Sequence, residues 1–167
     1  YFDQALKIYD GLIAKYPESA LTERTLLMIA YFRMKKGNFL DAVRNLRTYT
    51  ERFKTSPLVP NIELMMAQCL LRLQDFKESL VLYEKLLNSN SPDVREKAAF
   101  DVGDVFFERK DYLKAIKYYQ QALAKYPNSI AKYPNVPFNL AEAQFLAEKY
   151  KESLTSLKKF ISLYPTH

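Results

Sequence analysis

The sequence predicts an all-α fold, a right-handed solenoid of antiparallel helical hairpins with about nine helices. Three observations predict it. A short motif, an aromatic residue followed three positions later by a small residue, recurs five times along the chain. Between these motifs, apolar residues return every three to four positions, which is the period of an α-helix. No segment alternates apolar and polar residues with period two, so we expect no strands.

The recurring motif has a nearly constant spacing of 36 to 38 residues. The small residues that close it are Ala5, Ala42, Ser79, Ala115 and Ser153. A second set of small residues lies twelve positions before the last four of these: Ala30, Ala67, Gly103 and Ala141. Pairs of small residues at a fixed separation indicate two helices that cross closely in every repeat.

Short polar linkers and prolines mark the helix ends. The linkers at 36–38, 74–75, 110–111 and 148–149 are too brief for anything except an antiparallel hairpin. Tyr-Pro pairs end the helices that precede Pro17, Pro127 and Pro165. These markers predict one lone helix near 2–15, followed by four hairpins near 20–54, 60–89, 93–125 and 136–164.

Composition allows a real hydrophobic core and leaves nucleic-acid binding as a minor alternative. Hydrophobic residues make up 49% of the 167 residues and charged residues 26%. The net charge of +6 is compatible with nucleic acid or an anionic surface, but the basic residues are dispersed among 19 acidic ones. We interpret them as solvated helix faces. No apolar run approaches the roughly 20 residues of a transmembrane helix.

Residues suited to catalysis or metal binding are scarce. The single histidine, His167, excludes a histidine triad or cluster, and three glycines provide no phosphate-binding loop. The single cysteine, Cys69, lies in an apolar run and is expected to be a buried thiol. We therefore predict no enzyme activity, no catalytic, cofactor or metal site, and no small-molecule substrate.

The small, aromatic and proline positions together resemble the tetratricopeptide repeat family over essentially the whole chain. Two features depart from its pattern: the period exceeds the usual ~34 residues, and other residues replace the usual tryptophan of the first helix, namely Leu26, Glu63, Ala99 and Pro137. The resemblance implies one solenoid over 1–167, with a half repeat at 1–19 and repeats at 20–57, 58–91, 92–127 and 128–167. Because the chain opens inside a helical pattern, we expect it to be part of a longer protein.

The longer period and the Tyr-Pro-x-Ser ends resemble a bacterial envelope subgroup of this family. The segments Pro17-Glu-Ser19 and Pro127-Asn-Ser129 carry this likeness. The subgroup includes the lipoprotein of the outer-membrane barrel-assembly machine and the periplasmic coordinator of envelope constriction. It implies an envelope or periplasmic scaffold, with a cytoplasmic location as the alternative.

In this family the first helix of each hairpin lines a concave groove that binds a peptide or a partner helix. Taking Ala30, Ala67, Gly103 and Ala141 as references, the residues three before, one after and four after would face that groove. They are Leu27, Tyr31, Met34, Leu64, Gln68, Leu71, Phe100, Asp104, Phe107, Phe138, Glu142 and Phe145. The outer two positions are apolar in all four repeats, which favours an apolar ligand. The alternative is that adjacent first helices bury these side chains against each other.

Two further hypotheses concern association and a linker. The chain could be a structural subunit that associates through its convex face or its ends, including self-association through Phe2, Leu6 and Tyr9 of the half repeat. The segment Ala-Lys-Tyr-Pro-Asn occurs at 124–128 and again at 131–135. It is either a recognition loop or a duplication that a loop tolerates.

Overall fold

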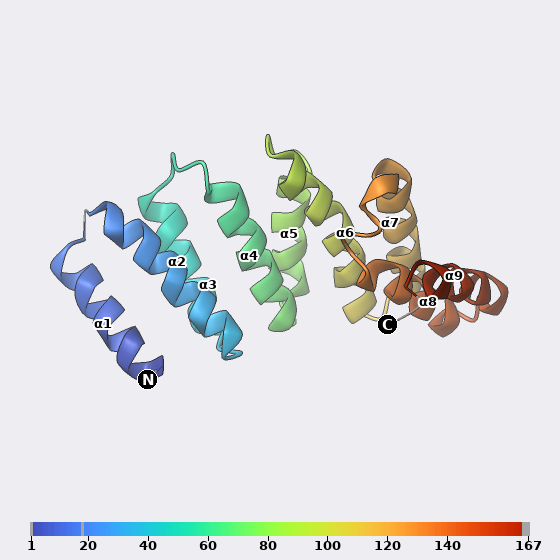
Figure 1. The fold of residues 1–167 in the computed structure, drawn as a ribbon, viewed down its shortest axis with the longest axis horizontal. Coiled ribbons are helices and arrows are strands. Elements are labelled where there is room, and N and C mark those ends of the chain that lie inside the picture. Colours follow the sequence, from blue (N-terminus) through green and yellow to red (C-terminus); the bar gives the residue numbers. More distant parts are fainter. Residues whose placement is uncertain (1, 18, 165–167) are drawn as a thin grey trace. The chain divides into compact units, whose positions relative to one another are not determined.

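The computed structural model describes residues 2–17 and 19–164 and contains nine α-helices within them (Figure 1). The helices are α1 (Phe2–Lys15), α2 (Ala20–Lys35), α3 (Phe39–Arg52), α4 (Val59–Arg72), α5 (Phe76–Leu86), α6 (Pro92–Glu108), α7 (Tyr112–Lys125), α8 (Asn135–Leu146) and α9 (Tyr150–Leu163), with a short 3-10 turn at Pro127–Ser129. No strand occurs in the described ranges. The predicted all-α hairpin architecture is confirmed. Pro165, His167 and the side chain of Phe2 lie outside the described residues.

Each hairpin turns through one residue in the left-handed backbone region. These residues are Gly37, Gln74, Lys110 and Glu148, with φ between 60° and 78°. The following amide donates to a carbonyl five residues earlier, as from Asp111 to Phe106 at 2.9 Å. This pattern is the Schellman motif, which satisfies the last carbonyls of the first helix and reverses the chain.

The chain divides into two compact units, Tyr1–Leu82 (unit 1) and Tyr83–His167 (unit 2). Unit 1 contains α1 to α4 and most of α5. Helix α3 packs between α2 and α4, and their shared core consists of Leu26, Ala30, Ala42, Val43, Leu46, Tyr49, Ile62, Met66, Cys69 and Leu70. The apolar positions that the helical period predicted therefore form a continuous core here.

Unit 2 contains the end of α5 and α6 to α9, built as the two hairpins α6–α7 and α8–α9. Its buried residues include Val94, Ala98, Phe100, Val102, Val105, Ala115, Tyr119, Ala122, Leu140, Ala141 and Ala143. Helix α8 packs mainly on α7 and makes fewer contacts with α6.

The predicted small residues lie where paired helices cross. Ala30, Ala67 and Ala141 are fully buried. Where the partner residue on the second helix is serine, its hydroxyl donates to the carbonyl of the small residue: Ser79 to Ala67 at 2.9 Å and Ser153 to Ala141 at 2.8 Å. Only a short side chain permits this approach, so the small residues are required by packing.

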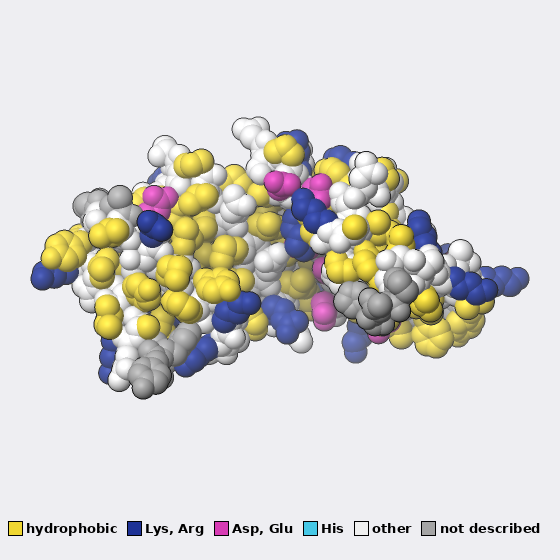
Figure 2. Space-filling model, viewed as in Figure 1, with side chains coloured by type: hydrophobic (Ala, Val, Ile, Leu, Met, Phe, Trp, Pro, Cys, Tyr) yellow, Lys and Arg dark blue, Asp and Glu magenta, His cyan; other side chains and the backbone are white. Residues whose placement is uncertain are grey.

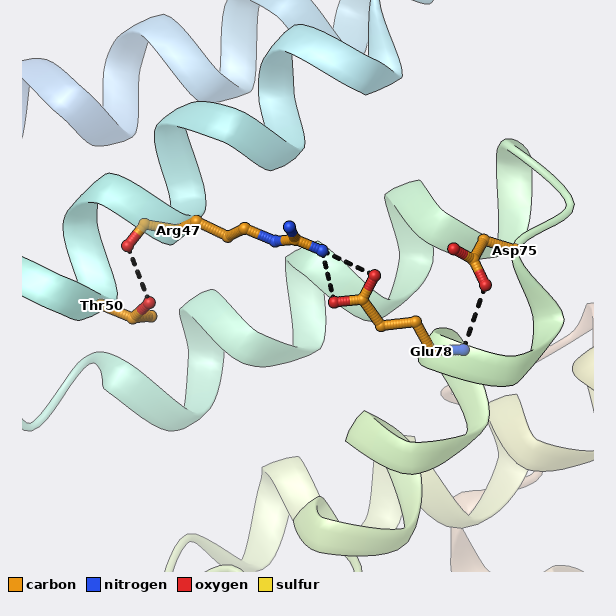
Figure 3. A network of polar contacts seen from close by, with 4 residues as sticks. All are labelled: Arg47, Thr50, Asp75 and Glu78. Carbon is orange, nitrogen blue, oxygen red and sulfur yellow. Dashed lines mark hydrogen bonds and ion pairs between the residues drawn. The ribbon is translucent and has the colours of Figure 1, made fainter.

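In unit 1 a surface ion pair also joins two successive second helices. Arg47 of α3 reaches Glu78 of α5 with one guanidinium nitrogen, which donates to both carboxylate oxygens, at 2.6 Å to Oε2 (Figure 3). Asp75 accepts from the amide of Glu78 at 3.1 Å and caps α5. Both partners of the ion pair are substantially exposed, so its contribution to stability is at most about 1 kcal/mol.

Candidate functional site

The exposed side of α2 carries an apolar stripe with basic ends. Arg24, Met28, Tyr31 and Lys35 are spaced by four, three and four residues, which places them on one helix face. All four are exposed, Met28 by 41% and Tyr31 by 46%. The opposite face of α2, with Leu26, Ile29 and Ala30, is buried in the core. Figure 2 shows hydrophobic side chains gathered over α2 and α4 of unit 1. An exposed apolar surface of this kind is typical of an interaction site.

The flanks of this stripe are half-buried and belong partly to the core. Leu27 and Met34 of α2 pack against the unit 1 core, as does Met65 of α4. Leu64, Gln68 and Leu71 of α4 are also half-buried. In unit 1, the outer predicted positions Leu27 and Met34 therefore contribute to the core, while Tyr31 is accessible.

In unit 2, the prediction that Phe100 is an accessible groove residue is wrong. Its side chain is 0% exposed. The rings of Tyr126 and Tyr133 lie against it, with centroids 6.3 Å and 4.9 Å away. Both tyrosines come from the end of α7 and the linker that follows. Phe100 is thus a core residue, because the chain itself covers the face that the family geometry leaves open.

Asp104, another predicted groove residue, joins three helices instead. Its Oδ1 accepts from the hydroxyl of Tyr119 on α7 at 2.5 Å and from the amide of Asn139 on α8 at 3.2 Å. Burial, followed by the negative charge of Asp101, raises the pKa of Asp104 to about 6. The carboxyl group is therefore a structural acceptor, and its ionised form is disfavoured by its surroundings.

The remaining predicted positions lie on α6 and α8 with varied exposure. Phe107 is half-buried and meets Tyr112 edge-on, with centroids 5.9 Å apart. Phe145 meets Tyr150 in the same way at 5.5 Å but is 58% exposed. These two contacts link the end of each first helix to the start of its second. Phe138, which tilts against Phe160, is exposed, as is Glu142.

Sequence reasoning missed a polar network in unit 1. Glu23 of α2 accepts a hydrogen bond from the hydroxyl of Tyr49 on α3 and another from Ser56 Oγ at 2.7 Å. These hydrogen bonds lower the pKa of Glu23. Tyr49 is fully buried, so the network satisfies a hydroxyl that would otherwise be costly to bury. A glutamate in the first turn of a helix is too common to indicate such a role.

The potential metal ligands among the described residues are dispersed. None of their histidine, cysteine, aspartate and glutamate side chains form a group of three that could hold a metal ion. Burial raises the pKa of the Cys69 thiol to about 11, which disfavours a reactive thiolate. A small apolar cleft of about 160 Å³ lies beside Ala99, at one of the positions where the family usually has tryptophan. Within the described helices, none has the length and hydrophobicity needed to span a membrane.

Comparison with protein families decides the classification. Two models, both described as tetratricopeptide repeat, match this sequence, one over residues 58–128 and the other over 2–19 and 138–167. Together the matches span more than half of the chain. The chain belongs to the tetratricopeptide repeat family. No curated protein matches the sequence.

Solved structures of other tetratricopeptide repeat proteins share the fold. A crystal structure of MamA has a TM-score of 0.75 at 18% identity, over 98% of this chain and 83% of that one. A tetratricopeptide repeat protein from Parabacteroides merdae has a TM-score of 0.76 at 18% identity, over 99% and 61%. MamA from Desulfovibrio magneticus RS-1 has a TM-score of 0.67 at 19% identity, over 87% and 77%. At these low identities, the TM-scores show that the fold is shared.

Tetratricopeptide repeats generally mediate protein–protein interactions and are generally non-enzymatic. The narrower resemblance to the bacterial envelope subgroup stays a prediction, as do the repeat boundaries. A repeat scaffold presents its ligand surface on the exposed faces of stacked helices. The accessible apolar stripe of α2 is therefore the part of this tetratricopeptide repeat chain that merits a functional proposal.

Proposed function

We propose that this chain is a non-enzymatic scaffold that binds a partner helix or peptide on the α2–α4 face of unit 1. The observation that supports this most is the exposed stripe Arg24, Met28, Tyr31 and Lys35. An apolar centre between two basic ends matches an amphipathic segment with an apolar middle and acidic flanks. Lys35 lies 5.4 Å from the centroid of the Tyr31 ring, so it can pair with an acidic group beside that ring.

The half-buried residues next to the stripe suit this role. Leu64, Met65 and Leu71 of α4 are half-buried and so present part of their apolar surface, and Met65 also packs against the unit 1 core. Methionines at 28, 34 and 65 adapt their shape to different ligands because they have unbranched, flexible side chains. A groove with a rigid base and adaptable apolar walls can bind helical segments of differing sequence.

A peptide-display selection against the immobilised chain tests this function. The expected result is enrichment of segments that carry apolar residues at helical spacing with acidic residues at the ends. Substitution of Met28→Glu with Tyr31→Glu should abolish binding of the enriched peptides. Leu40→Glu is the control, because Leu40 lies on second helix α3 and is also exposed, by 55%. Circular dichroism should show the same helix content in all variants, since the substituted residues are at the surface.

Two outcomes would refute the proposal. One is a selection without enrichment. The other is a set of enriched peptides that bind the double variant as tightly as the wild-type chain. Equal loss of binding in the Leu40→Glu control would indicate that the glutamates act through net charge rather than through contact at this face.

A second proposed function is assembly through α9, which one observation favours. Leu154 is 54% exposed, whereas its counterparts in the repeat register, Val43 and Ile116, are only 4% and 7% exposed. Ile161, seven residues later and on the same side of the helix, is 63% exposed and extends this apolar face along α9. Association of two copies would cover it. Sedimentation velocity should then show a dimer that Leu154→Glu with Ile161→Glu converts to monomer, and a wild-type monomer at all concentrations would refute this second function.

The residues of the half repeat named for self-association are partly covered in unit 1. Tyr9 stacks on Phe32 of α2, with ring centroids 6.3 Å apart, and Leu6 is half-buried. Among the described side chains of α1, Ile8 is the large apolar residue that is exposed, at 69%. Self-association through the half repeat stays a prediction.

A further inference from the structure

The linker between α7 and α8 occupies the face of α6 that a ligand would otherwise use. Figure 1 shows this segment passing across α6 within unit 2. It contains the second copy of Ala-Lys-Tyr-Pro-Asn, at 131–135. We call 130–134 the strap. The Tyr133 ring lies 4.9 Å from that of Phe100, the residue that family geometry places in the groove.

The strap is held on α6 by side chains of complementary charge. The ammonium group of Lys132 lies 3.0 Å from Asp93 Oδ1 and 3.2 Å from Glu96 Oε1, both on α6. Lys97 lies over the Tyr133 ring, 5.4 Å from its centroid. Burial, followed by the charge of Glu96, raises the pKa of Tyr133 to about 12. The acidic pair on α6 therefore binds the basic residue of the strap, Lys132. The next strap residue, Tyr133, packs against the aromatic ring of Phe100.

The backbone of the strap makes mostly local hydrogen bonds. The amide of Lys132 donates to Ser129 at 2.9 Å, and the amide of Val136 donates to Tyr133 at 3.0 Å. One longer-range bond comes from the Tyr164 hydroxyl to the carbonyl of Ile130 at 2.6 Å. Lys132 and Tyr133 thus hold the strap on α6 through side-chain contacts, which an external segment with the same side chains can reproduce.

We propose that the strap is an internal occupant of a second protein-binding site on α6, and that a partner segment with a basic residue followed by tyrosine or phenylalanine displaces it. The site consists of Asp93, Glu96 and Phe100. It differs from the proposed site on unit 1, where basic residues flank an apolar stripe, so its ligand has the opposite charge. The proposal does not rest on the function proposed for α2.

The strap should weaken external binding because it is tethered beside the site. A short flexible tether gives an effective concentration on the order of 1 mM. If an isolated strap peptide binds with a Kd of about 100 µM, the occupied site binds it roughly tenfold more weakly than the vacant site. Removal of the two anchoring side chains from the strap should therefore tighten peptide binding by about this factor.

Binding of a labelled peptide with the sequence of residues 129–136 tests the proposal directly. The variant Lys132→Ser with Tyr133→Ser should bind this peptide about tenfold more tightly than the wild-type chain. Addition of Asp93→Lys and Glu96→Lys to that variant should abolish binding. Lys125→Ser is the matched control, since Lys125 holds the same place in the first copy of the repeated segment. It should leave peptide binding at the wild-type level.

A fluorescence measurement keeps the test independent of the strap variant's stability. The chain has no tryptophan, so Tyr133→Trp introduces a single probe at the strap. Saturating strap peptide should shift its emission to longer wavelength as the indole leaves Phe100. A peptide with glutamate and serine in place of its lysine and tyrosine should cause no shift. Unchanged emission at saturating strap peptide, or equal peptide affinity in the wild-type and strap variants, would overturn the proposal.

Discussion

Gly103 provides the sharpest test of how the repeats pack. A Cβ at this position would lie 2.4 Å from both Cδ1 and Cε1 of Tyr119 and 3.0 Å from its Cγ. Carbon atoms prefer separations of about 3.5–4.0 Å, so Gly103→Ala requires a movement of roughly 1 Å or more. The Tyr119 ring is fully buried, and its hydroxyl is bonded to Asp104 at 2.5 Å. The ring therefore cannot move without disturbing its neighbours.

The expected cost combines overpacking with a weakened hydrogen bond. Overpacking of a core costs about 1–3 kcal/mol. A hydrogen bond to a charged group contributes about 1.5–3 kcal/mol. The better helix propensity of alanine returns about 1 kcal/mol. We expect Gly103→Ala to lower the free energy of unfolding by about 2–4 kcal/mol.

Urea unfolding followed by far-ultraviolet circular dichroism measures this change. Gly11→Ala is the matched control, because nothing lies within 4 Å of the added Cβ on α1. It should raise the free energy of unfolding by up to about 1 kcal/mol through helix propensity. Tyr119→Leu removes the ring, so Gly103→Ala should cost much less in that background. A cost under about 0.5 kcal/mol in the wild-type background, or an equal cost in both backgrounds, would refute the steric argument.

Three further changes test other features of unit 2. The pKa of Asp104 is raised to about 6, against about 4 in an unfolded chain, so its stabilising contribution is complete below pH ~4 and is lost as the pH rises through 6. At pH 7.5 the free energy of unfolding of Asp104→Asn should therefore exceed that of the wild type by about 1–2 kcal/mol. Between pH 4 and 6 it should depend less on pH than in the wild type, and an unchanged pH profile would contradict this. Ala99→Leu should fill the apolar cleft of about 160 Å³ and raise the free energy of unfolding by about 1 kcal/mol, measured as a higher Tm. A lower Tm would show that the cleft cannot accept the larger side chain. Lys149→Asp should add an N-cap to α9 that stabilises the fold by about 0.5–1 kcal/mol. The backbone at Lys149 (φ −86°, ψ 59°) matches that at Asp111, which caps α7 (φ −87°, ψ 69°). An unchanged free energy of unfolding, measured by chemical denaturation, would exclude such a cap.

Local sequence patterns predicted the helices and turns well because these features depend on neighbouring residues. The helix period, the prolines and the short polar linkers all act within a few positions of one another. The predicted lone helix near 2–15 coincides with α1, and the four hairpin turns lie at the predicted linkers. The small residues Ala30 and Ala67 could be recognised because the same close crossing is repeated along the chain.

The candidate site was predicted less completely, since accessibility depends on what covers each face. Phe138 is 44% exposed, as its repeat position implies, but Phe100 is buried at the equivalent position of another repeat. Nothing within α6 distinguishes the two cases. The difference arises from the strap, whose Tyr133 lies more than thirty residues away along the sequence.

By itself, then, the sequence determined the repeat, its helices, and the small residues that let paired helices cross, because local periodicity and steric size act in the same way in every repeat. Tertiary structure alone decided which first-helix side chains are accessible. It made Asp104 a structural acceptor by placing Tyr119 and Asn139 around it, and it covered Phe100 with the strap. Contacts between segments distant in sequence depend on the path of the folded chain, and a repeat pattern does not encode that path.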